Sequence, residues 1–309
     1  MSQIWQDYES QLTKNGKMDF GDMISYALEV AQKNWGKKGA QYSHILIDEF
    51  QDITDPQLEL IKCLLRNHTD GSNTSLFCVG DDWQNIFSFA GSDIQNIIDF
   101  GKHFEYPETT TLSINYRCPP NVVEASTSVA RMNSVKVDKE ISPSQKVRFP
   151  IRLIEGATSY TDSGYEEWEF REAKAKVQEL DRIRESAETI MVLARFNRSL
   201  RRLRLEFPGH EQRRISFQTI HKAKGTEADY VLLLGCVTGR LGFPSEMSKH
   251  RLLDVVDKDR GRWIDPVEEE RRLFYVALTR CKKQLFLFTS RNQKSPFIRE
   301  IEGYLTVGN

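Results

Sequence analysis

Short apolar runs alternate with amphipathic stretches along most of the chain. Runs rich in Ile, Leu, Val and Phe predict strands at 44–47, 76–79, 190–193, 215–217, 230–234 and 285–288. Apolar residues at helical spacing predict helices at 56–65, 121–132, 166–183 and 268–278. Strands that alternate with helices are typical of parallel sheets covered by helices. The pattern therefore predicts an α/β fold with parallel sheets flanked by helices.

Two regions depart from this alternation. Residues 1–40 are predicted to form polar helices, and their apolar faces consist of Trp5, Tyr8, Phe20, Met23, Ile24 and Leu28. Residues 133–164 carry Ser, Pro, Lys and Gly without a regular period, so they are predicted to be connecting structure. We divide the chain into a first domain at 1–115 and a second domain at 116–309.

Composition narrows the class of protein. The length of 309 residues suggests about two domains. The 43 Lys and Arg residues balance 44 Asp and Glu residues, which argues against a wholly basic nucleic-acid binder but leaves room for a local basic groove. No apolar run approaches the ~20 residues of a membrane span, and no secretory signal is predicted. The five cysteines form no Cys-x-x-Cys pair, so we expect reduced thiols in a cytoplasmic protein.

The first candidate for chemistry is an acidic strand end. Asp48 and Glu49 follow the apolar run 44–47. A carboxylate there could hold Mg²⁺, and its neighbour could take a proton from an attacking water. Alternatively, both carboxylates stabilise the start of the next helix, near Pro56.

The second candidate is the segment 79–91. Gln84 could orient a water molecule or a phosphate oxygen there. Phe87 and Phe89 are two positions apart, so in an extended segment they would face the same side and could stack on bases. Alternatively, both rings belong to the core, which is the commoner fate of Phe.

Three further segments carry cations or aromatic side chains. Tyr116 and Arg117 could stack on a nucleobase and reach a phosphate. The polar segment 218–227 could touch a phosphate backbone, or it could be an exposed loop. The helix at 268–278 runs from acidic to basic residues, which its dipole favours, and Arg280 at its end could act as an arginine finger.

A run of arginines at 195–214 is a candidate for contact with phosphates. Its members are Arg195, Arg198, Arg201, Arg202, Arg204, Arg213 and Arg214. Contacts of this kind with phosphates would make the affinity for nucleic acid depend on salt. A solvated helix face explains the same residues equally well.

In combination these segments resemble the motifs of a known family. DEFQD, GDDWQNIFSFAG, NYR, TIHKAKGTE and EEERRLFYVALTR, in this order between Asp48 and Arg280, resemble motifs II to VI of the UvrD/Rep-like superfamily 1 DNA helicases. The resemblance implies an incomplete RecA-like domain 1A at 1–115, with a remnant of helical domain 1B at 1–40. It implies a RecA-like domain 2A at 116–309. Only about 100 residues separate Arg117 from Thr219, so little or no 2B domain is expected.

The resemblance also implies roles for individual residues with ATP, Mg²⁺ and single-stranded DNA. Asp48 and Glu49 would hold Mg²⁺, and Glu49 would also activate the hydrolytic water. The other nucleotide contacts would be Gln84, Arg117 and Arg280 at the γ-phosphate, Tyr116 on adenine, and Glu227 near the ribose. The DNA contacts would be Phe87, Phe89, Thr219, His221 and Arg195. ATP bound between the two motor domains would drive movement along the strand with 3′ to 5′ polarity.

The sequence departs from the family in its phosphate loop. The pattern G-x-x-x-x-G-K-[ST] is absent from the 309 residues, and the Lys–Gly segment at 36–39 lacks its spacing. Ala90 also stands where the family has Arg after the motif III aromatic residue. We therefore expect this chain alone to hydrolyse ATP poorly, and to be part of a longer helicase or to have a partner that supplies the loop. The alternative is a non-catalytic module that binds single-stranded nucleic acid.

Overall fold

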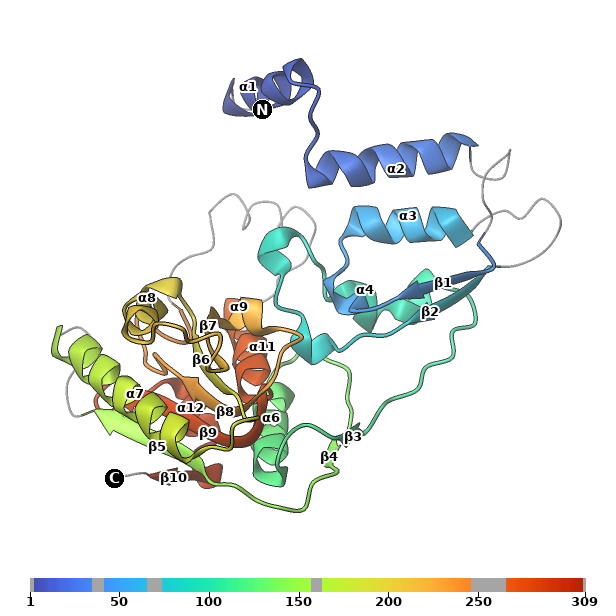
Figure 1. The fold of residues 1–309 in the computed structure, drawn as a ribbon. Coiled ribbons are helices and arrows are strands. Elements are labelled where there is room, and N and C mark those ends of the chain that lie inside the picture. Colours follow the sequence, from blue (N-terminus) through green and yellow to red (C-terminus); the bar gives the residue numbers. More distant parts are fainter. Residues whose placement is uncertain (1–2, 35–41, 66–73, 157–162, 246–264, 308–309) are drawn as a thin grey trace. The chain divides into compact units, whose positions relative to one another are not determined.

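The computed structural model describes residues 3–34, 42–65, 74–156, 163–245 and 265–307 (Figure 1). Internal contacts divide the chain into two compact units. The first unit comprises Met1–Asp82 and Ala90–Tyr106, and the second unit comprises Trp83–Phe89 and Pro107–Asn309. The segment Trp83–Phe89 thus packs with the second unit, although it precedes residue 115 in sequence. The domain boundary near residue 115 stays a prediction.

The first unit is built on a small parallel sheet. Its elements are α1 (Gln3–Lys14), α2 (Phe20–Asn34), β1 (His44–Ile47), η1 (Phe50–Asp52), α3 (Asp55–Leu65), β2 (Ser75–Cys78), α4 (Gln95–Ile98) and α5 (Phe100–His103). One face of the sheet packs on a core that includes Phe50, Ile53 and Leu58. On the other face Leu46 lies opposite Phe77, and these side chains are 73% and 62% exposed.

The second unit contains a larger sheet. Its strands are β5 (Ile151–Gly156), β6 (Ile190–Ala194), β7 (Ile215–Thr219), β8 (Ala228–Leu233), β9 (Cys281–Ser290) and β10 (Leu305–Val307). They form a six-stranded sheet in the order β10-β5-β9-β8-β6-β7, and every pair is parallel. A separate short pair joins β3 (Ile114–Asn115) to β4 (Ser142–Pro143). The predicted α/β fold with parallel sheets is confirmed.

Helices cover both faces of the six-stranded sheet (Figure 1). They are α6 (Pro120–Arg131), α7 (Ser163–Ile183), α8 (Asn197–Glu206), α9 (Ile220–Ala223), α11 (Pro266–Leu278) and α12 (Pro296–Glu300). Successive side chains of a strand point to opposite faces. In β6, Ile190 and Val192 therefore join the cluster with α7 and α8, while Met191 and Leu193 join the cluster with α6, α9, α11 and α12.

Local chemistry explains where α11 and α12 begin. The Asp265 carboxylate accepts a hydrogen bond from the Val267 amide (2.9 Å), and Pro266 occupies the first turn of α11. The Ser295 hydroxyl oxygen accepts one from the Phe297 amide (3.2 Å), with Pro296 in the first turn of α12. These side-chain acceptors satisfy amides that the helix itself leaves without partners.

The structure corrects two predictions about local structure. Residues 151–156 were expected to be connecting structure, but they form β5, which pairs with β9 and β10. Polar Arg152 and Glu155 break its apolar run. The segment around Phe87 and Phe89 is not extended either, because Ser88–Ala90 forms a 3-10 turn, η3.

Membrane-spanning helices are absent from the part of the chain that the structure describes, since none of its helices is both long and apolar enough.

A buried carboxyl group leads to a prediction about stability. Glu169 on α7 is fully enclosed, and its Oε1 accepts hydrogen bonds from the Tyr165 hydroxyl (2.9 Å) and the Gly235 amide (2.8 Å). Burial raises the pKa of Glu169 to about 7. The folded state therefore binds a proton that the unfolded chain releases above about pH 4.5, and this contribution to stability disappears as the pH rises through 7.

We expect Glu169→Gln to remove this pH dependence, because an amide oxygen can accept the same two hydrogen bonds without ionising. Between pH 5 and pH 9 the wild-type chain should lose about 2 kcal/mol more free energy of unfolding than the variant. Urea denaturation at several pH values measures this difference. Parallel curves for the two proteins across that range would contradict the prediction.

Candidate functional site

The acidic strand end lies in the first unit, directly after β1. The Asp48 Oδ1 atom accepts a hydrogen bond from the Glu49 amide (2.9 Å), and both side chains are exposed. Glu49 has left-handed backbone angles (φ 53°, ψ 42°), which are uncommon for residues other than glycine. Two accessible carboxylates at a strand end offer the oxygen ligands that Mg²⁺ prefers. Among the described residues there is no cluster of three or more His, Cys, Asp or Glu side chains suited to a metal ion.

An open pocket in the second unit gathers three of the predicted nucleotide residues. Its volume is about 490 Å³, and it is lined by Asn115, Tyr116, Arg117, Gln145, Glu227 and Lys282. The Tyr116 side chain is 73% exposed, so its ring is available for stacking. The pocket thus combines an aromatic ring with charged groups of both signs, a composition suited to a polar ligand with a planar ring.

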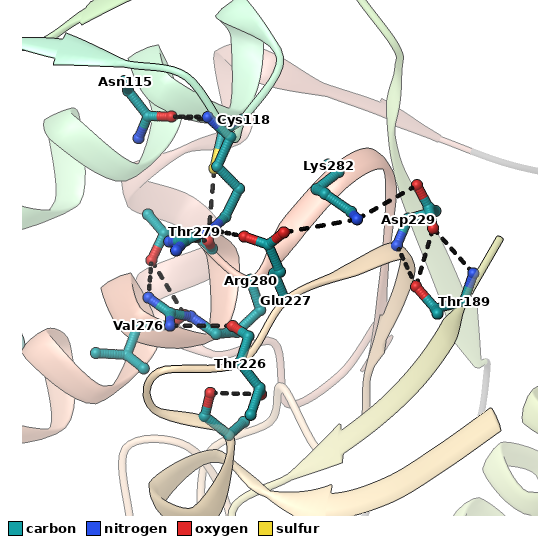
Figure 2. Close-up of polar contacts among 12 residues, drawn as sticks. Asn115, Cys118, Thr189, Thr226, Glu227, Asp229, Val276, Thr279, Arg280 and Lys282 are labelled. Carbon is teal, nitrogen blue, oxygen red and sulfur yellow. Dashed lines mark hydrogen bonds and ion pairs between the residues drawn. The ribbon is translucent and has the colours of Figure 1, made fainter. Parts of the chain in front are cut away.

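Ion pairs organise the charged wall of this pocket. The Arg117 Nε donates to Glu227 Oε2 (2.7 Å), and the Lys282 Nζ lies 3.6 Å from Glu227 Oε1 and 3.9 Å from Asp229 Oδ1. Figure 2 shows the pairs of Lys282 with Glu227 and Asp229. The hydrogen bond from Arg117 lowers the pKa of Glu227, so its carboxylate is ionised at neutral pH.

Side-chain amides fix the turn that carries Tyr116. The Asn115 Oδ1 accepts hydrogen bonds from the amides of Arg117 (3.0 Å) and Cys118 (2.8 Å), and the Gln145 Nε2 donates to the Arg117 carbonyl (2.5 Å). Sequence reasoning missed Gln145 and Lys282. Gln145 lies in a stretch with no regular pattern, and Lys282 resembles an ordinary lysine after a helix.

Arg280 is buried in the second unit, with 1% of its surface exposed. Its Nε donates to the Val276 carbonyl (2.9 Å), one terminal nitrogen donates to the Thr226 carbonyl (3.2 Å), and the other lies 3.4 Å from Gln84 Oε1 (Figure 2 shows the first two contacts). The structure therefore brings together Gln84 and Arg280, two residues that the resemblance assigns to the γ-phosphate.

A cluster of three rings forms the predicted DNA contact. The Phe87 and Phe89 rings lie 5.9 Å apart, and His221 lies 6.1 Å from Phe87 and 5.5 Å from Phe89, measured between ring centroids. Phe89 is 56% exposed and Phe87 is half-buried. We call these three residues the aromatic cluster. The two Phe rings are adjacent as predicted, although a 3-10 turn brings this about rather than an extended strand.

Contacts with Lys224, which follows α9, and with α11 hold the segment that carries Phe87 and Phe89. The Lys224 Nζ donates to the Gln84 carbonyl (2.9 Å) and lies 5.3 Å from the centre of the Phe87 ring. The Ser88 hydroxyl donates to Glu269 on α11. Trp83 packs edge-on against Tyr275 with ring centroids 5.5 Å apart. These contacts explain why Trp83–Phe89 belongs to the second unit.

The His221 ring of the aromatic cluster lies near the charge of Arg195. Burial, together with the nearby Arg195 charge, lowers the pKa of His221 to about 4, so its ring is neutral at pH 7. Arg195 donates from two nitrogens to Glu270 Oε1 (3.0 and 2.8 Å). Thr219 ends β7 and precedes α9, so it lies two residues from His221.

The arginine run in and around α8 makes ion pairs and carbonyl contacts. Arg198 pairs with Glu166 (3.4 Å), Arg202 with Glu167 (2.5 Å), and Arg213 with Asp181. The Arg204 guanidinium donates to the Phe217 carbonyl (2.6 Å). This arrangement favours the interpretation as a solvated helix face. The Lys–Gly segment at 36–39 lies outside the described residues.

Comparisons with known proteins match both parts of the chain to one family. Residues 1–105 match the model of the UvrD/REP helicase N-terminal domain, and residues 205–292 match that of the UvrD-like helicase C-terminal domain. The chain belongs to the UvrD-like helicase family.

Named relatives agree with this assignment. The chain is 28% identical to DNA helicase IV of Escherichia coli K12, over 96% of this chain and 41% of that protein. It is 30% identical to the ATP-dependent DNA helicase UvrD1 of Mycobacterium tuberculosis H37Rv, over 66% of this chain and 26% of that protein. The resemblance to UvrD/Rep-like helicases that the motif order indicates is confirmed. The chain spans less than half the length of either relative.

A solved structure described as the C-terminal domain of a possible DNA helicase from Lactobacillus plantarum WCFS1 also matches. The TM-score is 0.38 with 13% sequence identity, and the match covers 63% of this chain and 99% of that one.

The aromatic cluster leads to a prediction about DNA binding. Removing the exposed ring by Phe89→Ala should weaken the affinity for a single-stranded oligonucleotide about tenfold, because stacking on a base contributes about 1–3 kcal/mol. The slope of log affinity against log salt should stay unchanged, since no charge is removed. Fluorescence anisotropy at several salt concentrations measures both quantities.

Leu205→Ala is the matched control, because Leu205 is an apolar side chain of α8 that is 79% exposed. Equal DNA affinities for wild type, Phe89→Ala and Leu205→Ala would refute a stacking role for Phe89.

Proposed function

We propose that this chain is the C-terminal part of an ATP-dependent DNA helicase or translocase that acts on single-stranded DNA with 3′ to 5′ polarity. The pocket around Tyr116, Arg117 and Glu227 is the observation that carries the proposal. The motifs assign all three residues to one nucleotide, and the second unit gathers them around one pocket of suitable size. The domains would be the partial 1A domain at 1–115 and the 2A domain at 116–309.

In this proposal the pocket residues bind and orient ATP. The Tyr116 ring stacks on adenine, Glu227 accepts a hydrogen bond from the ribose, and Arg117 exchanges its pairing with Glu227 for contact with phosphate. Gln84 and Arg280, which lie together, stabilise the negative charge that develops at the γ-phosphate. Positioning and charge stabilisation account for most of the catalysis of phosphoryl transfer.

The acidic strand end supplies the remaining chemistry. Bound Mg²⁺ would neutralise charge on the phosphates, and the exposed Asp48 and Glu49 carboxylates fit the oxygen chemistry of such a site. Glu49 would accept a proton from the attacking water. Both carboxylates directly follow β1, so they would lie at the carboxyl edge of the sheet.

The aromatic cluster would bind the DNA strand. Phe87 and Phe89 would stack on bases, and the neutral His221 ring supports them from α9. Thr219 lies at the end of the strand that leads into α9, so it would link this surface to the residues that contact nucleotide. Arg195 would lie beside His221 at this surface, with its positive charge paired with the Glu270 carboxylate.

We also propose that another polypeptide segment, carrying the phosphate loop, completes the first unit. Parallel sheets are normally covered on both faces, yet β1 and β2 expose Leu46 and Phe77 on one face. A further strand and helix of an α/β domain would cover these side chains. Without that segment, ATP hydrolysis by this chain is expected to be slow. A cytoplasmic location remains the expectation from the cysteine pattern.

A second candidate is a non-catalytic module that binds single-stranded nucleic acid. The aromatic cluster favours it, because the second unit alone contains Phe87, Phe89 and His221. Nucleotide binding separates the candidates, since only the helicase requires it.

Tyr116→Ala tests the proposed nucleotide pocket. Loss of the ring should weaken binding of a fluorescent ATP analogue about tenfold, because an aromatic stack on a base contributes about 1–3 kcal/mol. Tyr116→Trp should retain the affinity, since its ring can stack as well. Tyr106→Ala is the matched control, because Tyr106 is a tyrosine with 95% exposure that lies in the first unit. Unchanged affinity in Tyr116→Ala, or no nucleotide binding by the wild-type chain, would contradict the proposal.

A further inference from the structure

A buried amide connects the ends of the two strands in the first unit. Gln51 follows the acidic strand end by two residues, and its side chain is fully buried. Its Nε2 donates to Glu49 Oε2 (2.5 Å), and its Oε1 accepts from the Asp81 amide (2.8 Å). One side chain thus bridges the carboxyl end of β1 and the carboxyl end of β2.

The neighbouring backbone fixes which way this amide points. The Asp81 amide is a donor, so only the oxygen of Gln51 can face it, and the nitrogen must then face Glu49. The hydrogen-bond partners therefore decide which end of the Gln51 side-chain amide is oxygen and which is nitrogen. A carboxylate at Glu49 completes the arrangement, because it can only accept.

Close packing leaves the amide little freedom to move. A Cβ atom on Gly80 would lie 2.9 Å from Gln51 Oε1 and 3.2 Å from the Gln51 backbone nitrogen. The Phe50 amide also donates to the Val79 carbonyl (2.9 Å), and the Val79 amide donates to the Ile47 carbonyl (2.8 Å). Gly80 therefore permits this close approach, and a larger residue there would displace Gln51.

We propose that Gln51 is a positioning residue that fixes the Glu49 carboxylate relative to the end of β2. The part of this proposal that concerns catalysis rests on the proposed function of Glu49. The left-handed backbone of Glu49 places its side chain on a sharp turn, and the donation from Gln51 selects one orientation of that side chain. A displacement at Asp81, which lies directly before η2 (Asp82–Gln84), would reach Glu49 through this amide.

The alternative is that Gln51 only satisfies the Asp81 backbone amide. Gln51→Glu separates the two roles at a pH high enough to ionise the introduced carboxyl group, because an ionised carboxylate can still accept from Asp81 but cannot donate to Glu49 and repels it. Gln57→Leu is the matched control. Gln57 is a nearby glutamine in the first unit whose Oε1 accepts from the Thr54 amide (2.8 Å).

The test uses side-chain amide resonances of the full chain in ¹⁵N NMR spectra, which require no ATP turnover. The Gln51 pair is assigned from its loss in Gln51→Glu. Glu49→Ala should shift that pair and speed its exchange with solvent at least tenfold, while Glu59→Ala on the exposed face of α3 should leave it unchanged. An unaltered Gln51 pair in Glu49→Ala would overturn the proposal.

The slow hydrolysis of ATP that is expected of this chain gives the second readout. Gln51→Glu should lower kcat about tenfold or more with little change in KM, because misplacing a catalytic group slows the chemical step. In a Glu49→Gln background it should have no further effect, and Gln57→Leu should retain the wild-type kcat. Full activity in Gln51→Glu would overturn the positioning role. A chain that shows the NMR link but neither binds nor hydrolyses ATP would instead refute the proposed function.

Discussion

The second unit depends on the burial of the Arg280 guanidinium. A buried cation is costly unless hydrogen bonds satisfy it, so the chain must bring acceptors to it. They come from three separate segments, namely the end of α11, the loop before β8 and the segment that carries Gln84. Because one side chain joins these segments, it sets the positions of both the proposed nucleotide pocket and the turn that leads to the aromatic cluster.

These two surfaces lie at different ends of the strands. Glu227 and Arg280 precede β8 and β9, so the pocket lies at the amino ends of those strands. Thr219 ends β7, and His221 follows on α9, which returns the chain toward the start of β8. The short segment from His221 to Glu227 therefore connects the two surfaces directly. A displacement at one surface therefore has to pass through only a few residues of the chain to reach the other surface.

The sequence predicts the framework well because short apolar runs are a simple signal for strands. Strands such as 44–47 and 190–193 are apolar runs, and the structure forms them there. β5 was missed because Arg152 and Glu155 interrupt its apolar run. The adjacency of Phe87 and Phe89 was predicted from the wrong backbone conformation, since spacing alone cannot distinguish an extended segment from a 3-10 turn.

The supporting side chains could not be predicted in the same way. Gln51, Gln145 and Lys282 gain their roles from partners that are distant in sequence, such as Asp81 for Gln51 and Arg117 for Gln145. Their residue types are common in loops and on surfaces. The motifs mark groups that are predicted to contact ligands, whereas these supporting contacts appear only when the strands are placed side by side.

We propose that one unit carries separate surfaces for nucleotide and for DNA. Photocrosslinking of the full chain with 8-azido-ATP and with an oligonucleotide containing 5-iodouracil, followed by peptide mapping, tests it most directly. The account predicts that the nucleotide labels the peptide with Tyr116 and that the oligonucleotide labels peptides with Phe89 or His221. Labelling of one shared peptide by both probes, or of peptides outside these two surfaces, would contradict it.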